Sequence, residues 1–275
     1  ITDINSQSIA IVASRSEFGI SSYRIGTGGP VHVDTSGPAD GVGIMVPTDI
    51  AVASVGNQTF LIVASEPSQG ESGALTVIAL GAGGKLTPTD HVLDTHESRF
   101  GNVQAIETVS TGLQTLIVAA GGDHGLTILE LLPNGQLLHR ASFDGTAAHP
   151  LDDVTALEAV VIGSALHVFA ATETGDGITR FTYDISGHGL TIQALLDGAA
   201  LGTTQDDVLV DSTGEETLQG GEGADIFVLT GDNNLDVIEG FEATEDRLDL
   251  SSWTFLYDAG SLLITPTADG ALIRF

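Results

Sequence analysis

The chain has 275 residues, of which 42% are hydrophobic and 16% charged, which suits one or two folded domains and excludes a disordered acidic tail. Lysine and arginine total 8 against 37 aspartates and glutamates, and the net charge of −29 disfavours nucleic acid and anionic membrane surfaces as partners. Cysteine is absent, so disulfides are excluded, and no apolar run approaches the roughly 18 residues of a membrane span.

Four short apolar segments recur along most of the chain and predict a structural repeat. Each ends in an alanine and a small residue, and they span residues 9–14, 60–65, 116–121 and 167–172. With Ala13, Ala64, Ala119 and Ala170 as anchors, the repeats are 51, 55 and 51 residues apart. We therefore expect the four alanines to occupy equivalent positions in four consecutive units.

Each anchor is followed by a polar turn, a glycine and a second strand, which is typical of a β-hairpin. A further glycine turn and strand follow in three units, at Gly84, Gly135 and Gly189, and an earlier strand precedes three of the anchors. Four antiparallel strands in about 50 residues are the pattern of a β-propeller blade. Residues 1–198 therefore resemble lactonase-like and other degenerate propellers, with a β-sandwich as the alternative.

About three and a half blades are visible, because residues 1–4 leave little room for a leading strand. A propeller usually closes with about four to eight blades. We expect the missing blades to come from sequence upstream of this chain, with a partner protein as the alternative source. The N-terminus also lacks the basic and apolar regions of a cleavable signal peptide, which leaves open export by a route that does not read it.

After residue 201 the pattern changes to a nine-residue step. Three copies place Asp207, Glu216 and Asp225 at the sixth position and Leu209, Leu218 and Phe227 at the eighth, where the side chain is expected to point into a core. The copies resemble the calcium-binding repeat of RTX (haemolysin-type) proteins, Gly-Gly-x-Gly-x-Asp-x-U-x with U a large apolar residue. This resemblance implies a short parallel β-roll at residues 199–275, so that, with the upstream repeat, we expect an all-β chain in which a partial or degenerate propeller precedes the roll.

Calcium prefers six to eight oxygen ligands, which a turn supplies through backbone carbonyls and a carboxylate. Glycine permits such a turn because it reaches positive φ and leaves room for the ion. In the RTX family an ion lies between the turns of repeats n and n + 2, which here pairs the turn at 202–207 with the turn at 220–225. The implied Ca²⁺ site residues are Gly202, Gln205, Asp207, Gly220, Gly221, Gly223 and Asp225, with the two aspartates as carboxylate ligands.

The middle copy departs from this motif. Asp211 and Ser212 replace glycines and Glu216 replaces aspartate, so we expect its turn to be a poor calcium site. If a second ion binds, Asp232 or Asp236 is the expected ligand.

The end of the chain supports the same resemblance. Residues 236–251 are similar to the segment that closes many RTX rolls, and the alternation of apolar and polar residues in 253–275 predicts a final hairpin. Because RTX rolls lie near the export signal of type I secretion systems, the resemblance implies a secreted, extracellular protein.

Some propellers are hydrolases that hold a metal in the central channel. The comparable acids and amides here are Asp49, Asn102, Asp152 and Asp153, with Glu107 and Glu158 further along two inner strands. No Gly-x-Ser-x-Gly elbow, His-Glu-x-x-His helix or phosphate loop accompanies them, and we expect His124 to lie on an exposed turn.

Two functions follow from these patterns. The favoured one is a secreted calcium-binding protein whose propeller docks a protein or surface glycan and whose roll folds on calcium. The alternative is a secreted metal-dependent hydrolase with its site in the propeller channel.

Overall fold

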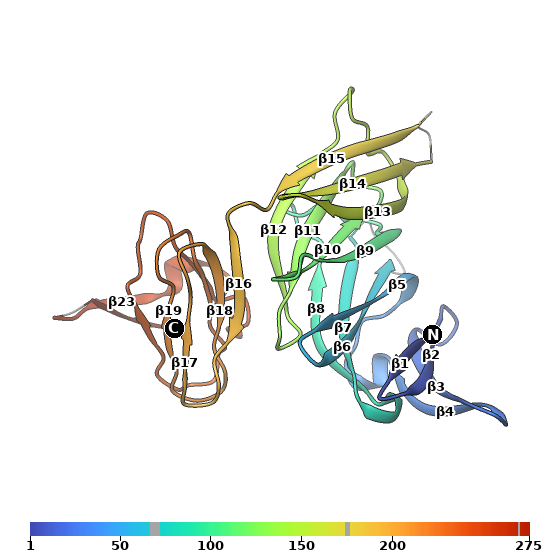
Figure 1. Cartoon of the computed structure of the whole chain (residues 1–275), viewed down its shortest axis with the longest axis horizontal. Helices are drawn as coiled ribbons and strands as arrows, with labels where there is room; N and C mark the ends of the chain where they lie inside the picture. Colours follow the sequence, from blue (N-terminus) through green and yellow to red (C-terminus); the bar gives the residue numbers. More distant parts are fainter. Residues whose placement is uncertain (67–71, 174–176, 269) are drawn as a thin grey trace. The chain divides into compact units, whose positions relative to one another are not determined.

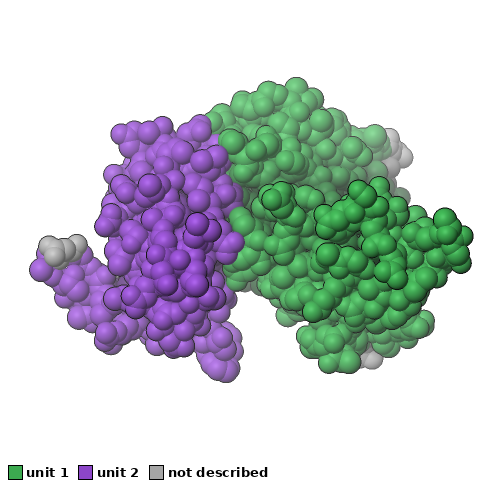
Figure 2. All heavy atoms as spheres, turned by 60° about the horizontal axis from the view of Figure 1, so that its bottom comes forward, with its two compact units in different colours: residues 1–186 green, residues 187–275 purple. Residues whose placement is uncertain are grey.

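The computed structural model describes residues 1–66, 72–173, 177–268 and 270–275. The chain is all-β and divides into two compact units, residues 1–186 and 187–275 (Figure 2). Single 3-10 turns form at Pro38–Asp40, Ala82–Gly84 and Ala259–Ser261. Within the described ranges, no helix has the length and apolar character that crossing a bilayer requires.

Unit 1 consists of antiparallel sheets that follow one another along the chain, each as an up-and-down meander (Figure 1). The first sheet is β1 (Thr2–Ile4), β2 (Gln7–Ser14), β3 (Gly19–Gly26) and β4 (Gly29–Ser36); the second is β5 (Val46–Val55), β6 (Gln58–Glu66), β7 (Ala74–Leu80) and β8 (Leu86–Leu93); the third is β9 (Ala105–Ser110), β10 (Thr115–Ala120), β11 (Gly125–Leu131) and β12 (Leu137–Asp144); the fourth is β13 (Val154–Ile162), β14 (Ala165–Thr172) and β15 (Ile178–Asp184). The predicted repeat therefore exists as consecutive sheets, which by themselves do not show a propeller.

Consecutive sheets pack face to face through apolar side chains. Ile9 and Ile20 of the first sheet share a core with the second, and Phe60 of the second shares another core with Ile117 of the third. A third core joins the third and fourth sheets. The middle sheets are covered on both faces, so their central strands are largely apolar and buried, as in β10, where every residue is buried.

The four anchor alanines lie on the second strand of their sheets, β2, β6, β10 and β14, as predicted. Their predicted equivalence fails for the direction in which they face. Ala13 and Ala64 pack toward the following sheet, whereas Ala119 and Ala170 pack toward the preceding one. Successive side chains of a strand point to opposite faces of the sheet. With an interval of 55 residues, Ala119 occupies a strand position that faces the opposite way from the position of Ala64.

A bulge recurs at the same place in the first three sheets, between the third and fourth strands. Beside the bulges of the first two sheets, Asp34 and Asp90 point to the next sheet. Asp34 accepts a hydrogen bond from the amide of Leu86 at 2.9 Å, and Asp90 accepts one from the amide of Leu137 at 2.7 Å. These carboxylates fasten the fourth strand of each sheet to the start of the next sheet's fourth strand.

Unit 2 is a parallel β-solenoid with two sheets. One sheet contains β16 (His188–Gln193), β18 (Asp206–Val210), β20 (Ile226–Val228) and β22 (Arg247–Asp249); the other contains β17 (Ala199–Leu201), β19 (Thr217–Gln219) and β21 (Val237–Glu239). The chain alternates between the two sheets, as a β-roll requires.

The strand expected at Gly189 does not complete the fourth antiparallel sheet. It is part of β16, which pairs in parallel with β18, because the amide of Leu190 donates to the Asp207 carboxylate at 2.5 Å. The second compact unit accordingly starts at Gly187, upstream of the expected boundary at residue 199.

The eighth positions of the repeat fill the interior of the roll. Leu209, Leu218 and Phe227 are fully buried in one cluster, as predicted for inward-facing residues. The ring of Phe227 also contacts that of Phe241, with the centroids 5.9 Å apart. Past the roll, β23 (Leu263–Pro266) and β24 (Ala271–Arg274) pair antiparallel, which confirms the final hairpin.

Candidate metal centre

The turns of the solenoid lie at two edges, because each turn carries the chain from one sheet to the other. We call edge A the set of turns at residues 202–205, 220–225 and 240–246, and edge B the set at residues 194–198, 211–216 and 229–236. Turns on the same edge are stacked, whereas successive nine-residue copies fall on opposite edges. The structure therefore brings the first and third copies together at edge A and places the middle copy at edge B.

The edge A turns are stacked by backbone contacts. The amide of Gly202 donates to the carbonyl of Gln219 at 2.8 Å, and the amide of Glu222 donates to that of Thr203 at 3.3 Å. Such close stacking depends on glycine. A Cβ added to Gly202 would overlap the carbonyl oxygen of Gly220, and one on Gly221 would overlap that of Thr203.

Two glycines of the third copy also adopt a backbone that other residues avoid. Gly221 has φ of 108° and Gly223 has φ of 114°, both in the left-handed region. A Cβ on Gly223 would overlap the carbonyl group of Gln205 in the neighbouring turn. Two of the three motif glycines of the third copy thus have a positive φ, which the motif was expected to require.

A column of buried carboxylates runs along edge A. The Leu190 amide donates to Asp207, the Asp207 amide donates to Asp225 at 2.8 Å, and the Asp225 amide donates to Asp246 at 2.9 Å. All three carboxylates are at least nine-tenths buried. Each aspartate thus accepts a hydrogen bond from the preceding part of the solenoid: Asp207 from β16, Asp225 from β18, and Asp246 from the turn at 220–225.

Asp225 differs from its neighbours in the column because one of its oxygens has no partner. Asp207 uses its second oxygen to accept from the amide and hydroxyl of Thr203, and Asp246 uses its own to accept from the amide of Glu242. The corresponding residue for Asp225 is Gly221, whose left-handed backbone leaves Asp225 Oδ2 buried and without a hydrogen bond among the described residues.

The charge of Asp225 is unfavourable in this position without a counterion. Burial raises its pKa to about 6, and the nearby carboxylates of Asp246 and Asp207 act in the same direction. Isolated buried carboxylates are rare because burying an unpaired charge costs several kcal/mol. A cation next to Asp225 Oδ2 would remove this cost.

Asp246 was not among the site residues predicted from the sequence. It follows Asp225 by 21 residues, whereas Asp225 follows Asp207 by 18. The last edge A turn is longer than the repeat allows, so a search for a nine-residue step does not align it. The left-handed Gly240 at the start of that turn is the signal that marks it as an edge turn.

The edge A residues fit calcium better than a metal held by side chains alone. The described part of the chain contains no group of three or more His, Cys, Asp or Glu side chains that could hold a metal. Calcium, however, takes its oxygen ligands from backbone carbonyls as well as from carboxylates. The residues that would hold it are Asp207 and Asp225, with carbonyls of the turns around Gly202, Gln205, Gly220, Gly221 and Gly223.

At edge B the middle copy is arranged differently. The Glu216 carboxylate accepts hydrogen bonds from the Asp197 amide at 2.9 Å and the Ser212 hydroxyl at 2.6 Å. Of the two residues considered for a second ion, Asp236 accepts from the Glu216 amide at 3.0 Å, and Asp232 accepts from Asn234. These carboxylates are used by the turns themselves.

The acids considered for a propeller channel do not form one ring. Asp49 and Glu107 line a groove of about 400 Å³ between β5, β9 and β13, and Asn102 and Asp153 line a separate groove. Glu158 acts on Glu107 through its charge, although burial is the main reason that the pKa of Glu107 is raised. Asp49 also accepts from the amides of Ile50 and Ile106.

The remaining channel candidate, Asp152, pairs with the Nδ1 atom of His124 at 2.5 Å. The His124 side chain is largely exposed on its turn, as predicted. Two of the candidates thus serve local structure: Asp49 holds neighbouring strands together, and Asp152 pairs with an exposed histidine.

No known family model matches the chain, and no curated protein is similar enough to it to count as a relative. The physical arrangement of the roll and the sequence motif therefore carry the functional argument.

Proposed function

We propose that unit 2 is an RTX-type β-roll that binds Ca²⁺ at edge A, in a secreted protein whose unit 1 supplies propeller blades as a rigid docking module. The observation that carries the proposal is Asp225 Oδ2. It is a buried carboxylate oxygen that has no hydrogen-bond partner within the described ranges, and it lies in the one copy that matches the motif throughout, between two turns whose glycines allow close stacking.

Calcium would supply what edge A lacks. Asp207 and Asp225 bring two negative charges into adjacent turns, and Asp206 and Asp246 add to the field at Asp225. A divalent cation would reverse the sign of these interactions and would take Asp225 Oδ2 as a ligand. Because unfolded repeats offer no preformed site, the binding free energy would contribute to folding.

An extracellular setting would suit a roll that folds on calcium. Extracellular modules commonly bind calcium with a dissociation constant of about 10⁻⁴ to 10⁻³ M, which matches the calcium concentration outside cells rather than inside. A roll of this affinity would stay unfolded in a cytosol and fold after export. The metal would then stabilise a chain without cysteine, where disulfides are not available.

For unit 1 we propose a docking role. Successive antiparallel meanders pack face to face, and the first strands of three sheets share one groove, as the inner strands of propeller blades do. The channel candidates fall in two grooves and on one exposed turn, and no catalytic motif accompanies them, so we favour docking of a protein or glycan over catalysis.

Calorimetric titration of the full chain with CaCl₂ tests the calcium proposal, with MgCl₂ as the control ion. We expect saturable binding of Ca²⁺ below about 1 mM and much weaker binding of Mg²⁺, which demands a tighter octahedral site. Absence of calcium heat, together with equal thermal stability in calcium and in chelator, would show that the proposal is wrong.

A further inference from the structure

Edge B satisfies the carbonyls of its turns with side chains. The Thr230 hydroxyl donates to the carbonyl of Ser212 at 2.9 Å, and the Asn234 side-chain amide donates to that of Thr213 at 2.8 Å. These bonds join the turn at 229–236 to the turn at 211–216. In a calcium turn, carbonyls of this kind are ligands of the ion. At edge B, the Thr230 hydroxyl and the Asn234 amide bind these carbonyls in place of a cation.

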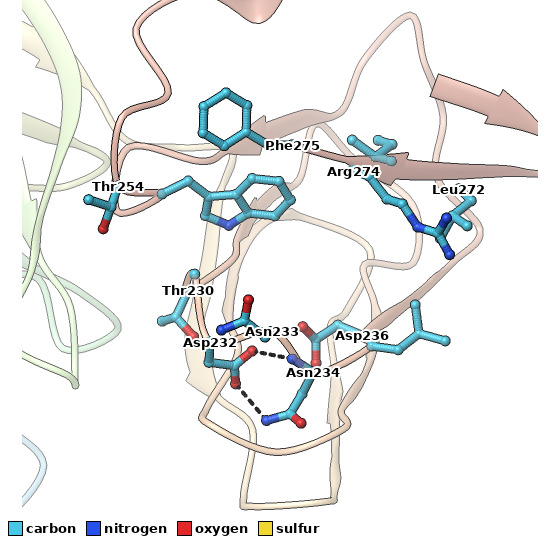
Figure 3. A pocket seen from close by; sticks show the side chains of 13 residues that line it. Thr230, Asp232, Asn233, Asn234, Asp236, Thr254, Leu272, Arg274 and Phe275 are labelled. Carbon is cyan, nitrogen blue, oxygen red and sulfur yellow. Dashed lines mark hydrogen bonds between the residues drawn. The ribbon is translucent and has the colours of Figure 1, made fainter. Parts of the chain in front are cut away.

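The Asn234 side chain is held in place for this role. Its backbone amide donates to Asp232 Oδ1 at 2.9 Å and its side-chain amide donates to Asp232 Oδ2 at 3.3 Å (Figure 3). The three residues Asp232, Asn234 and Asp236 line a pocket of about 700 Å³ beside the final hairpin. Asp232 thus orients the amide that reaches the neighbouring turn.

Glu216 completes edge B from the other side. Besides Asp197 and the Ser212 hydroxyl, it accepts hydrogen bonds from the amides of Ser212 and Gly214, each at 3.2 Å. Burial would raise the pKa of Glu216, but the hydrogen bonds from Ser212 and Asp197 outweigh it and lower the pKa. The N–H and O–H donors inside this turn therefore stabilise the charged Glu216 carboxylate, so that it does not need a cation as its partner.

We infer that edge B is stabilised without calcium, so that the ion controls the order of edge A alone. The inference rests on the proposed function, because it describes how far the effect of the ion at edge A extends. At edge A, backbone amides join the turns, and none of the residues that the structure describes donates to Asp225 Oδ2. At edge B, Thr230, Asn234 and Glu216 provide the bonds between and within turns.

One group at edge B favours the opposite interpretation. Asp211 is fully buried, and its Oδ1 atom has no hydrogen-bond partner among the described residues, although Oδ2 accepts from the Thr230 amide at 2.7 Å. Asp236 and Asp232 are its nearby charges. A second calcium ion at Asp211 is therefore the competing outcome, and the experiment has to separate it from the inference.

Hydrogen exchange of the full chain in calcium and in chelator makes this separation. In chelator we expect edge A amides, such as those of Asp207 and Ala224, to lose protection by about 100-fold or more. Edge B amides, such as those of Gly214 and Thr230, should change by less than about threefold. If edge A does not respond to calcium, the proposed function fails. If both edges lose protection together, only the present inference fails.

Matched variants give the second readout. Thr230→Val removes the hydroxyl with little change of shape, and we expect exchange in the turn at 211–216 to rise about fivefold in calcium and in chelator alike. Its calcium affinity should stay within about twofold of the parent. Asp211→Asn should leave the number of bound ions unchanged. A loss of one ion in Asp211→Asn, or a calcium-dependent effect of Thr230→Val, would overturn the inference.

Discussion

Replacing Asp225 by asparagine should have effects of opposite sign in calcium and in chelator. The substitution keeps the size of the side chain but removes the charge of a carboxylate that is 1% exposed and lacks a partner for one oxygen. Without calcium, that charge opposes folding. With calcium bound as proposed, it would be a ligand.

The magnitudes follow from the structure. Burial raises the pKa of Asp225 from 3.8 to about 6, which corresponds to about 3 kcal/mol at pH 7.5, so we expect Asp225→Asn to stabilise the calcium-free roll by about 1 to 3 kcal/mol. At 100 times the dissociation constant, calcium stabilises the parent by about 2.7 kcal/mol. If the variant binds about 100-fold more weakly, its gain at the same concentration falls to about 0.4 kcal/mol.

The single tryptophan of the chain provides the assay. Trp253 lies in unit 2 against Gly231, so its fluorescence during urea unfolding reports on the roll separately from unit 1. Glu222→Gln is the matched control, because it removes one charge from an exposed position of the same turn. An Asp225→Asn variant that is less stable than the parent in chelator, or that keeps the full calcium gain, would refute the reasoning.

Three further predictions concern other parts of the molecule. In chelator, the stability of the roll should fall as pH rises from about 4 to about 7. Burial raises the pKa of Asp211 to about 7 and that of Asp225 to about 6, so the folded state binds more protons than the unfolded state in this window. Unfolding curves followed by Trp253 fluorescence across this pH range check the sign. Gly223→Ala should cost about 1 to 3 kcal/mol in the same assay, owing to its φ of 114° and its overlap with the neighbouring turn. Gly28→Ala, in unit 1 with open space around it, should change the stability of unit 1 by less than about 0.5 kcal/mol, as measured by far-UV circular dichroism. Asp90→Ala should destabilise unit 1 by about 1 to 2 kcal/mol, seen as a lower melting temperature by far-UV circular dichroism, because it removes an acceptor that joins the second and third sheets.

The local patterns of the sequence predicted the repeat well. Short apolar strands followed by glycine turns define hairpins through contacts between near neighbours, and the structure has an antiparallel meander in each of the four repeats of unit 1. The inward position of Leu218 followed from the nine-residue step in the same way. The facing of Ala119 did not follow, because a strand keeps its pattern when it is shifted by one residue, while every side chain changes face.

Other features depended on partners that are distant in sequence. The direction of β16 is determined by its pairing with β18 and by the Leu190 contact with Asp207, which a hairpin pattern around Gly189 does not contain. Asp246 was missed because the turn before it breaks the regular step. The sequence could not show that one Asp225 oxygen lacks a partner among the described residues, because this depends on the backbone conformation at Gly221. The glycines of the motif did indicate an unusual backbone in this turn.

The assignment of successive copies to opposite edges has a consequence for how such rolls diverge. Odd and even copies form two separate sets of contacts between turns. The turns at 202–205 and 220–225 stack with each other and not with the turn at 211–216. A substitution in the turn of an even copy, for example at Glu216, changes hydrogen bonds of its own edge. The turns of one edge can therefore accumulate substitutions while the other edge keeps its proposed ion site. Duplication of two copies at a time would extend both edges and preserve this division.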